Sequence, residues 1–150
     1  MKHKIVLFFI AVLFCTANLL SQPYRSALGA ASEFTFKDYY ATGVSFKFFM
    51  GKKSAGEIAA LASNGGYYIS LLYQYHFALD NKKQLYGYLG AGAFNIIYPR
   101  GTLGLEYRPA AFPLSIAADW RPFYEWRVDD DIDNRGLKHF GISLRYVLKN

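Results

Sequence analysis

Four charged side chains occupy every second position along two neighbouring segments of Thr102–Trp126. They are Glu106 and Arg108 in the first segment and Asp119 and Arg121 in the second. The positions between them are mostly apolar or aromatic, and this period of two is typical of β-strands. An ordinary sheet would place such charges in water, whereas a closed barrel would enclose them and require them to pair. The segment therefore predicts two adjacent strands and, if the sheet closes, buried ion pairs.

The same alternation places further charges on the inward face of other segments. The predicted charge network of the lumen comprises Lys47, Glu57, Glu106, Arg108, Asp119, Arg121 and Arg145. An eight-stranded barrel is just filled by its own side chains. We therefore interpret the network as a structural plug that fixes strand register, and a gated pore is the alternative.

Other chemistry has weaker sequence support. Ser70 and His76 share a strand face but lie six positions apart, about 20 Å along an extended chain. No G-x-S-x-G frame, zinc-type Cys/His cluster or glycine-rich phosphate loop occurs. We therefore expect neither enzymatic activity nor a cofactor, and a lipid-modifying enzyme is kept as a rival.

An acidic stretch invites comparison with a calcium loop. Asp129, Asp131 and Asp133 have the EF-hand spacing, but Asn134 occupies the glycine position and Phe140 the position of the bidentate glutamate. We therefore predict no metal site there but a solvated loop, with weak cation bridging to lipopolysaccharide phosphate as an intermediate possibility.

The elements that must position these residues are all predicted strands, joined by three longer loops and by tight turns. The strands are Tyr24–Ala31, Tyr40–Met50, Ala55–Ala62, Tyr67–Leu79, Gln84–Phe94, the two segments of Thr102–Trp126, and His139–Leu148; the longer loops are Ser32–Asp38, Asn95–Gly101 and Val128–Leu137. The third strand is rich in alanine and also scores as helix. Gly87, Gly90 and Gly92 are expected to make room for large side chains. The Tyr, Phe and Trp residues are expected to form the outer wall and its interfacial belts, and stacking on a sugar or nucleobase is the weaker alternative.

Composition agrees with a barrel whose outside is apolar. The 150 residues predict one domain, aromatic residues make up 19% and charged residues only 19%, and no long apolar run follows residue 20. A soluble β-sandwich is the alternative and should carry more surface charge. The net charge of +6 does not indicate nucleic-acid binding, because the basic residues are scattered and because the amino terminus, described next, predicts export.

The amino terminus has the pattern of a secretory signal peptide. A basic start precedes the apolar run Ile5–Phe14, and small and polar residues follow up to Ser21. We expect cleavage after Ser21, with Ala17 as second choice, so that residues 1–21 are the signal and residues 22–150 the barrel. A lipoprotein anchor at Cys15 is disfavoured because the bulky Phe14 precedes it. The mature chain then has no cysteine and no disulfide.

The chain resembles the small outer-membrane β-barrel proteins of Bacteroidetes-type bacteria, which share the architecture of the OmpA and OmpX barrels. The resemblance rests on SALGAA, TGVSFKFFMG, YYISLLYQYHFAL, LYGYLGAGA, GTLGLEYRP, PLSIAADWRPFYEW and FGISLRYVL. It implies a Gram-negative outer-membrane location. The last strand also resembles the signal read by the barrel-assembly machinery, carried by His139, Gly141, Leu144 and Tyr146.

Together these patterns predict an all-β protein, an eight-stranded antiparallel up-and-down transmembrane barrel that is monomeric. Its expected role is structural or in surface interaction, with outer-membrane lipid, lipopolysaccharide and the assembly machinery as partners and a possible extracellular partner at the longer loops. A small ion or solute channel is the first rival. A soluble lipocalin-like carrier is a further alternative.

Overall fold

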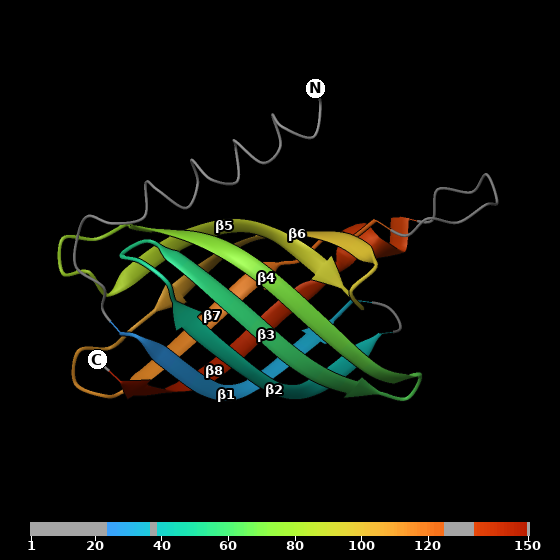
Figure 1. Cartoon of the computed structure of the whole chain (residues 1–150), viewed down its shortest axis with the longest axis horizontal. Helices are drawn as coiled ribbons and strands as arrows, with labels where there is room; N and C mark the ends of the chain where they lie inside the picture. Colours follow the sequence, from blue (N-terminus) through green and yellow to red (C-terminus); the bar gives the residue numbers. More distant parts are fainter. Residues whose placement is uncertain (1–23, 37–38, 125–133, 150) are drawn as a thin grey trace, which may run out of the picture.

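The computed structural model describes residues 24–36, 39–124 and 134–149, and it folds them into a closed barrel (Figure 1). The strands are β1 (Ser26–Phe34), β2 (Tyr40–Phe49), β3 (Ser54–Ser63), β4 (Gly66–Ala78), β5 (Leu85–Phe94), β6 (Tyr98–Tyr107), β7 (Leu114–Trp120) and β8 (Phe140–Lys149), with a 3-10 helix η1 (Asn134–Lys138) before β8. Each strand pairs antiparallel with the next, and β8 pairs with β1. The predicted eight-stranded antiparallel barrel is therefore confirmed.

Among the described residues, no helix has the length and apolar character needed to cross a membrane.

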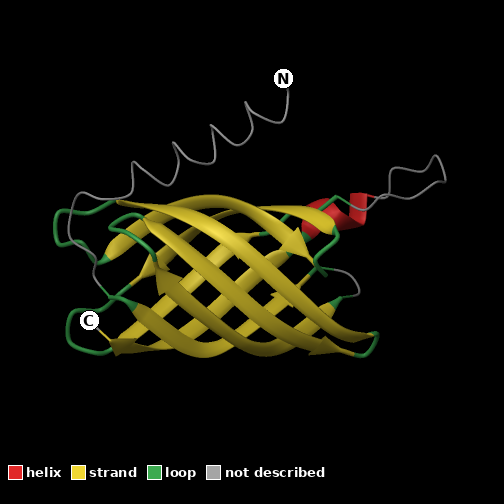
Figure 2. Ribbon diagram, viewed as in Figure 1, coloured by secondary structure: helices red, strands yellow, loops and turns green. Residues whose placement is uncertain are grey.

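The barrel has two distinct ends. At the terminal end, on the left in Figure 1, β1 begins and β8 ends side by side, and Ser26 is paired with Lys149. At the opposite end, which we call the loop end, Figure 2 shows η1. The connections after β1, β3 and β5 are also at the loop end and are short, covering residues 35–39, 64–65 and 95–97. The connection from β7 to β8 is much longer than these three.

Two of the predicted longer loops were wrong in extent. Ser32–Asp38 was expected to be a loop, but β1 continues through Phe34; Asn95–Gly101 was also expected to be a loop, but β6 begins at Tyr98. The pairs Phe34↔Tyr40 and Phe94↔Tyr98 extend the ladders to the loop end. Glu33 and Arg100, which fall in these two stretches, are enclosed inside the barrel.

Side chains alternate between an apolar outer face and a polar inner face, as the period of two predicts. On β2, Val44 is 59% exposed, whereas its neighbour Ser45 and the lysine Lys47 are fully buried. The same holds around the barrel for the outward apolar side chains Leu28, Ile58, Ile69, Leu71, Leu89, Leu103, Leu105, Ile116, Ile142 and Leu144. The described outer wall is thus lined by aliphatic and aromatic groups.

Small inward residues leave room for long charged ones. The alanine-rich third segment is a strand, and Ala55 and Ala59 point inward and are fully buried. Of the three glycines expected to make room for large side chains, Gly87 does so, because an added Cβ would come within 2.5 Å of the Phe77 ring. At Gly90 and Gly92 the obstacle is instead the backbone of β4, so the reason given for those two glycines was wrong.

The start of β1 departs from simple alternation. By simple alternation Arg25 would share the inward face of Ala27, but Arg25 is exposed and Tyr24 is buried. The register between β1 and β8 shifts between Ser26 and Ala27. A shift of this kind moves the preceding residues to the opposite face of the sheet.

Candidate functional site

A single carboxylate organises the interior near the terminal end. Glu106 on β6 is fully buried and accepts hydrogen bonds from Lys47 (2.8 Å), Tyr24 (2.6 Å), Arg108 (3.1 Å) and Ser115. His76 lies 3.5 Å from the same carboxylate. We call these residues the Glu106 cluster. It ties β2, β4, β6 and β7 to one anionic centre.

A single guanidinium organises the middle of the barrel and the interior toward the loop end. Arg121 donates to Asp119 (2.6 Å), Glu57 (2.9 Å) and Glu33 (3.1 Å). Two further arginines extend this Arg121 cluster: Arg100 makes a two-point contact with Glu33 at 2.7 and 2.8 Å, and Arg145 lies 2.9 Å from Glu57. Uncharged side chains complete it, through Tyr88 on Asp119 (2.6 Å), Gln74 on Glu57 (2.9 Å), Ser70 on Arg100 (2.8 Å) and Ser45 on Arg145 (2.9 Å).

The structure places all seven predicted network residues inside the barrel and in ion pairs. They divide between the two clusters, with Lys47, Glu106 and Arg108 in one and Glu57, Asp119, Arg121 and Arg145 in the other. Sequence reasoning missed Glu33 and Arg100, because it placed them in loops. Both residues fall on the alternate positions that face inward, and this could have identified them. Glu33 continues the inward series of Ala27 and Ala31, and Arg100 continues that of Glu106.

Aromatic rings close the terminal end around a cation. The Arg108 guanidinium carbon lies 4.0 Å from the Tyr86 ring centre, 4.6 Å from that of Tyr24 and 5.0 Å from that of Phe49. Such contacts stabilise a cation that has left water. The Arg108 side chain thus fills the terminal end of the lumen, where it pairs with Glu106 and contacts three aromatic rings.

A closed circle of five aromatic rings lies over the charges at the loop end. The successive centre-to-centre distances are Tyr39–Tyr68 5.7 Å, Tyr68–Phe94 5.4 Å, Phe94–Phe123 4.8 Å, Phe123–His139 4.7 Å and His139–Tyr39 4.9 Å. The guanidinium of Arg100 lies 4.7 Å from the Phe94 ring centre. We call this set the aromatic cap. The assignment of Tyr and Phe residues to the outer wall was wrong for its members Tyr39, Tyr68, Phe94 and Phe123.

Backbone hydrogen bonds hold the segment after β7 under this cap. The N–H groups of Arg121, Phe123 and Tyr124 donate to the carbonyls of His139, Gly136 and Pro99 at 2.8, 3.0 and 2.9 Å, in that order. The Trp120 indole donates to the Leu137 carbonyl at 2.6 Å. The stretch that carries Arg121 and Phe123 is therefore fixed to both β6 and η1.

The predicted assembly-signal residues have definite positions. His139 is buried in the aromatic cap, and burial, aided by the Arg100 charge, lowers its pKa to about 4. Gly141 lies against Asp119 and Arg121, where an added Cβ would collide with the ion pair. The remaining two, Leu144 and Tyr146, are about half exposed on the outer wall. Their role in assembly stays a prediction.

The other candidate chemistry is not assembled. Ser70 accepts from Arg100, whereas His76 lies beside Glu106 and stacks on Tyr88 at 4.9 Å, so the serine and histidine belong to different clusters. Within the described parts of the chain, no three His, Cys, Asp or Glu side chains gather in a metal-binding arrangement. The Asp129–Asp133 stretch and the signal segment 1–21 lie outside the described residues.

These features define a closed eight-stranded barrel with a polar, ion-paired inside and an apolar outside. No protein-family model matches the chain, and no curated protein matches its sequence. One solved structure that is similar comes from work described as the de novo design of transmembrane β-barrels. It is 13% identical, the match covers 85% of this chain and 98% of that one, and the TM-score is 0.63. The likeness shows that the two chains share a fold.

Proposed function

We propose that the protein is a non-enzymatic outer-membrane β-barrel with a structural or surface-interaction role, whose lumen is plugged by its charged network. The observation that carries this proposal is the inversion of polarity, with apolar side chains outside and ion pairs inside. A wall of exposed Leu, Ile, Val and aromatic residues is costly in water but suits hydrocarbon. Barrel closure also gives every strand two neighbours, so the sheet has no free edge strand, and a hydrocarbon environment requires such closure.

The plug is favoured over a channel by what fills the interior. The Glu106 and Arg121 clusters cross the lumen, Arg108 and its rings lie at one end, and the aromatic cap lies at the other. An ion that entered would have to separate buried pairs, which costs several kcal/mol. We therefore expect no steady conductance.

Planar-bilayer recording of the refolded barrel tests the plug. The wild-type protein should give no steady current, and Arg121→Ala, which removes the centre of one cluster, should at most give brief openings. A steady ohmic current through the wild-type barrel would instead favour a small channel. In each case, a different mobility of unheated and boiled samples on an SDS gel would show that the barrel is folded.

Expression of the full chain in a Gram-negative host tests the location. We expect the protein in the outer-membrane fraction, resistant to extraction with urea, with a mature chain that begins after Ser21. Recovery in the periplasmic soluble fraction would favour a lipocalin-like carrier and contradict the proposal. Depletion of the assembly machinery should reduce the folded form.

The non-enzymatic part of the proposal rests on the separation of Ser70 from His76 and on the ion pairing of the buried carboxylates. Lipid mass spectrometry of membranes with and without the protein tests it. We expect no change in acyl composition or headgroup mass. A mass shift that disappears in His76→Ala would establish a lipid-modifying enzyme instead.

A further inference from the structure

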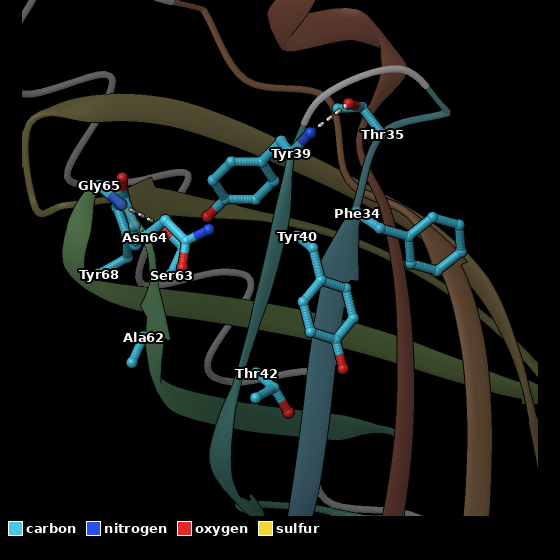
Figure 3. Close-up of a pocket in the computed structure, with 10 residues that line it drawn as sticks. All are labelled: Phe34, Thr35, Tyr39, Tyr40, Thr42, Ala62, Ser63, Asn64, Gly65 and Tyr68. Atoms are coloured by element: carbon cyan, nitrogen blue, oxygen red, sulfur yellow. Dashed lines mark hydrogen bonds between the residues drawn. The ribbon is translucent and has the colours of Figure 1, made fainter.

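Two hairpins separate at the loop end and leave a cavity between them. The β2–β3 ladder ends at Thr42↔Ala62, whereas β1–β2 pairing continues to Tyr40 and β3–β4 pairing continues to Ser63. The resulting cavity has a volume of about 990 Å³ (Figure 3). We call it the rim notch, and it is lined by Phe34, Thr35, Tyr39, Tyr40, Thr42, Ala62, Ser63, Asn64, Gly65 and Tyr68.

The chemistry of the rim notch differs from that of the lumen beside it. None of its ten lining residues is charged. Four of them are aromatic, and the Ser63 hydroxyl and the Asn64 amide can donate hydrogen bonds to a ligand. The Thr42 hydroxyl donates to the Ala31 carbonyl at 3.3 Å, so it would act toward a ligand as an acceptor. A phosphate or carboxylate ligand would find no cation among these residues. The lining instead fits a neutral ligand with apolar faces and many hydroxyl groups.

The aromatic part of the lining is held in place before any ligand binds. Tyr39 and Tyr68 belong to the aromatic cap, and the Tyr39 N–H donates to the Thr35 hydroxyl at 3.2 Å. Figure 3 shows the Tyr39 ring reaching toward the side where Ser63 and Asn64 lie. Rings fixed in this way lose little entropy when a ligand stacks on them.

Two further details indicate that the rim notch has groups available for a ligand. The Tyr39 hydroxyl is buried and has no hydrogen-bond partner among the described residues, and burial together with nearby Glu33 raises the pKa of this phenol, so it remains a donor. A buried polar group without a partner costs about 1–3 kcal/mol. At the mouth, Tyr40 is 62% exposed and offers an aromatic face.

We propose that the rim notch binds a neutral oligosaccharide. The apolar faces of the sugar rings would stack on the tyrosines, and the sugar hydroxyls would bond to Thr42, Ser63 and Asn64. The Tyr39 O–H group would turn toward the sugar while its ring stays in the aromatic cap. The cavity volume lies at the upper end of the range of about 300–1,000 Å³ for ligand pockets. The inference deepens the proposed surface-interaction role and rests on it, because the loop end must face outward to meet such a glycan.

A peptide strand added to the sheet is the competing occupant. Strand addition needs a run of unpaired backbone groups along an edge. Here β2 extends past the end of the β2–β3 ladder only through Tyr40 and Ala41, and β3 only through Ser63. This edge is too short for strand pairing, so a saccharide is favoured.

The test uses the mature barrel folded in detergent, probed with an array of neutral and acidic trisaccharides and then titrated calorimetrically with the best neutral binder. Tyr40→Ala should weaken binding at least tenfold and Tyr39→Phe about threefold. The control is Tyr67→Ala, because Tyr67 is 89% exposed and adjacent to Tyr68 but does not line the rim notch. It should change affinity less than twofold.

Several results would overturn the inference: no neutral sugar retained, equal losses in Tyr40→Ala and Tyr67→Ala, or binding confined to acidic sugars or to extended peptides. The mobility of unheated samples on an SDS gel identifies any variant that fails to fold. If Tyr40→Ala does not fold, the affinity of Tyr39→Phe tests the inference instead. Lipopolysaccharide with a long glycan chain, compared with lipid A alone, distinguishes a glycan of the same membrane from a free one. A membrane-located barrel that binds no sugar removes only this inference, whereas a soluble location removes the proposed function.

Discussion

The two clusters inside the barrel solve charge burial in opposite ways. In the Glu106 cluster one carboxylate serves the two cations Lys47 and Arg108. In the Arg121 cluster three guanidinium groups meet three carboxylates, so the charges balance; its members are Arg100, Arg121, Arg145, Glu33, Glu57 and Asp119. The first therefore depends on one residue, and the second has alternative partners.

This difference teaches where the barrel is vulnerable. If Arg121 is lost, Glu33 keeps Arg100 and Glu57 keeps Arg145. If Glu106 is lost, no other described carboxylate is paired with Lys47 or Arg108. Removing one partner of a buried pair is costly because the other charge stays buried and alone. The comparison predicts an order of stability losses.

The largest loss is expected for Glu106→Gln. The substitution keeps the shape but leaves Lys47 and Arg108 without a counter-charge, so the free energy of unfolding should fall by about 3–5 kcal/mol. Urea titration of the barrel in detergent, followed by tryptophan fluorescence, measures it. The double variant Glu106→Gln/Lys47→Met should recover part of the loss, and a loss below that of Arg121→Met would contradict the comparison.

Arg121→Met should cost less, about 1–3 kcal/mol, although Arg121 makes more ion pairs. Asp119 alone loses its cation, and it keeps the hydroxyls of Tyr88 at 2.6 Å and Thr102 at 3.4 Å. A charged group that stays hydrogen-bonded carries a smaller penalty than one left bare. The same urea titration applies, and a loss above 5 kcal/mol would show that the alternative pairs do not hold.

Gly141→Ala tests the Arg121 cluster in a second way, because it disturbs the packing of Asp119 and Arg121 without removing a charge. The new methyl group would come within 2.5 Å of Arg121 Nε and also collide with Asp119, so overpacking should cost about 1–2 kcal/mol. Gly101→Ala is the matched control, because its Cβ would meet Pro122 at an ordinary 3.5 Å. Measurement in detergent separates this packing effect from any role in assembly, and equal losses for the two variants would refute it.

The effect expected to be smallest at neutral pH is a pH dependence at the loop end, because it develops only below about pH 6.5. His139 has a folded-state pKa of about 4, below the ordinary value of 6.5, because burial and Arg100 disfavour its charged form. The unfolded chain therefore binds the proton first as the pH falls, so this contribution to stability is present above pH 6.5 and is lost between 6.5 and 4. In His139→Phe the free energy of unfolding should therefore fall less between pH 6.5 and 4 than it does in the wild-type protein, as urea titrations at a series of pH values would measure. Superimposable curves would mean that His139 is not buried in solution.

Most of the strands of the barrel, but only some of its buried charges, could be predicted from the sequence. Strict alternation, as in Leu103, Leu105 and Tyr107 against Glu106, identified the strands and the face of each charge, because a closed sheet has one inside and one outside. Glu33 and Arg100 were missed since polar residues near strand ends look like loop. Extending the parity of neighbouring strand residues would have found both.

The partition into two clusters could not be predicted. It depends on which residues meet across the lumen, and that follows from barrel closure and strand stagger rather than from any one strand. The aromatic cap was missed for a related reason: Tyr39, Phe123 and His139 lie outside the strands, where alternation gives no direction. The rim notch likewise exists only because two ladders end at different levels.

The pairing of β1 with β8 makes the order of strands a circle. Because the first and last strands finish at the same end of the molecule, a short linker can join them, and the chain can be opened instead at the turn between β4 and β5, which lies at that same end. Such a circular permutant keeps every ladder and both clusters intact. The barrel architecture therefore does not fix at which turn of that end the chain must be open.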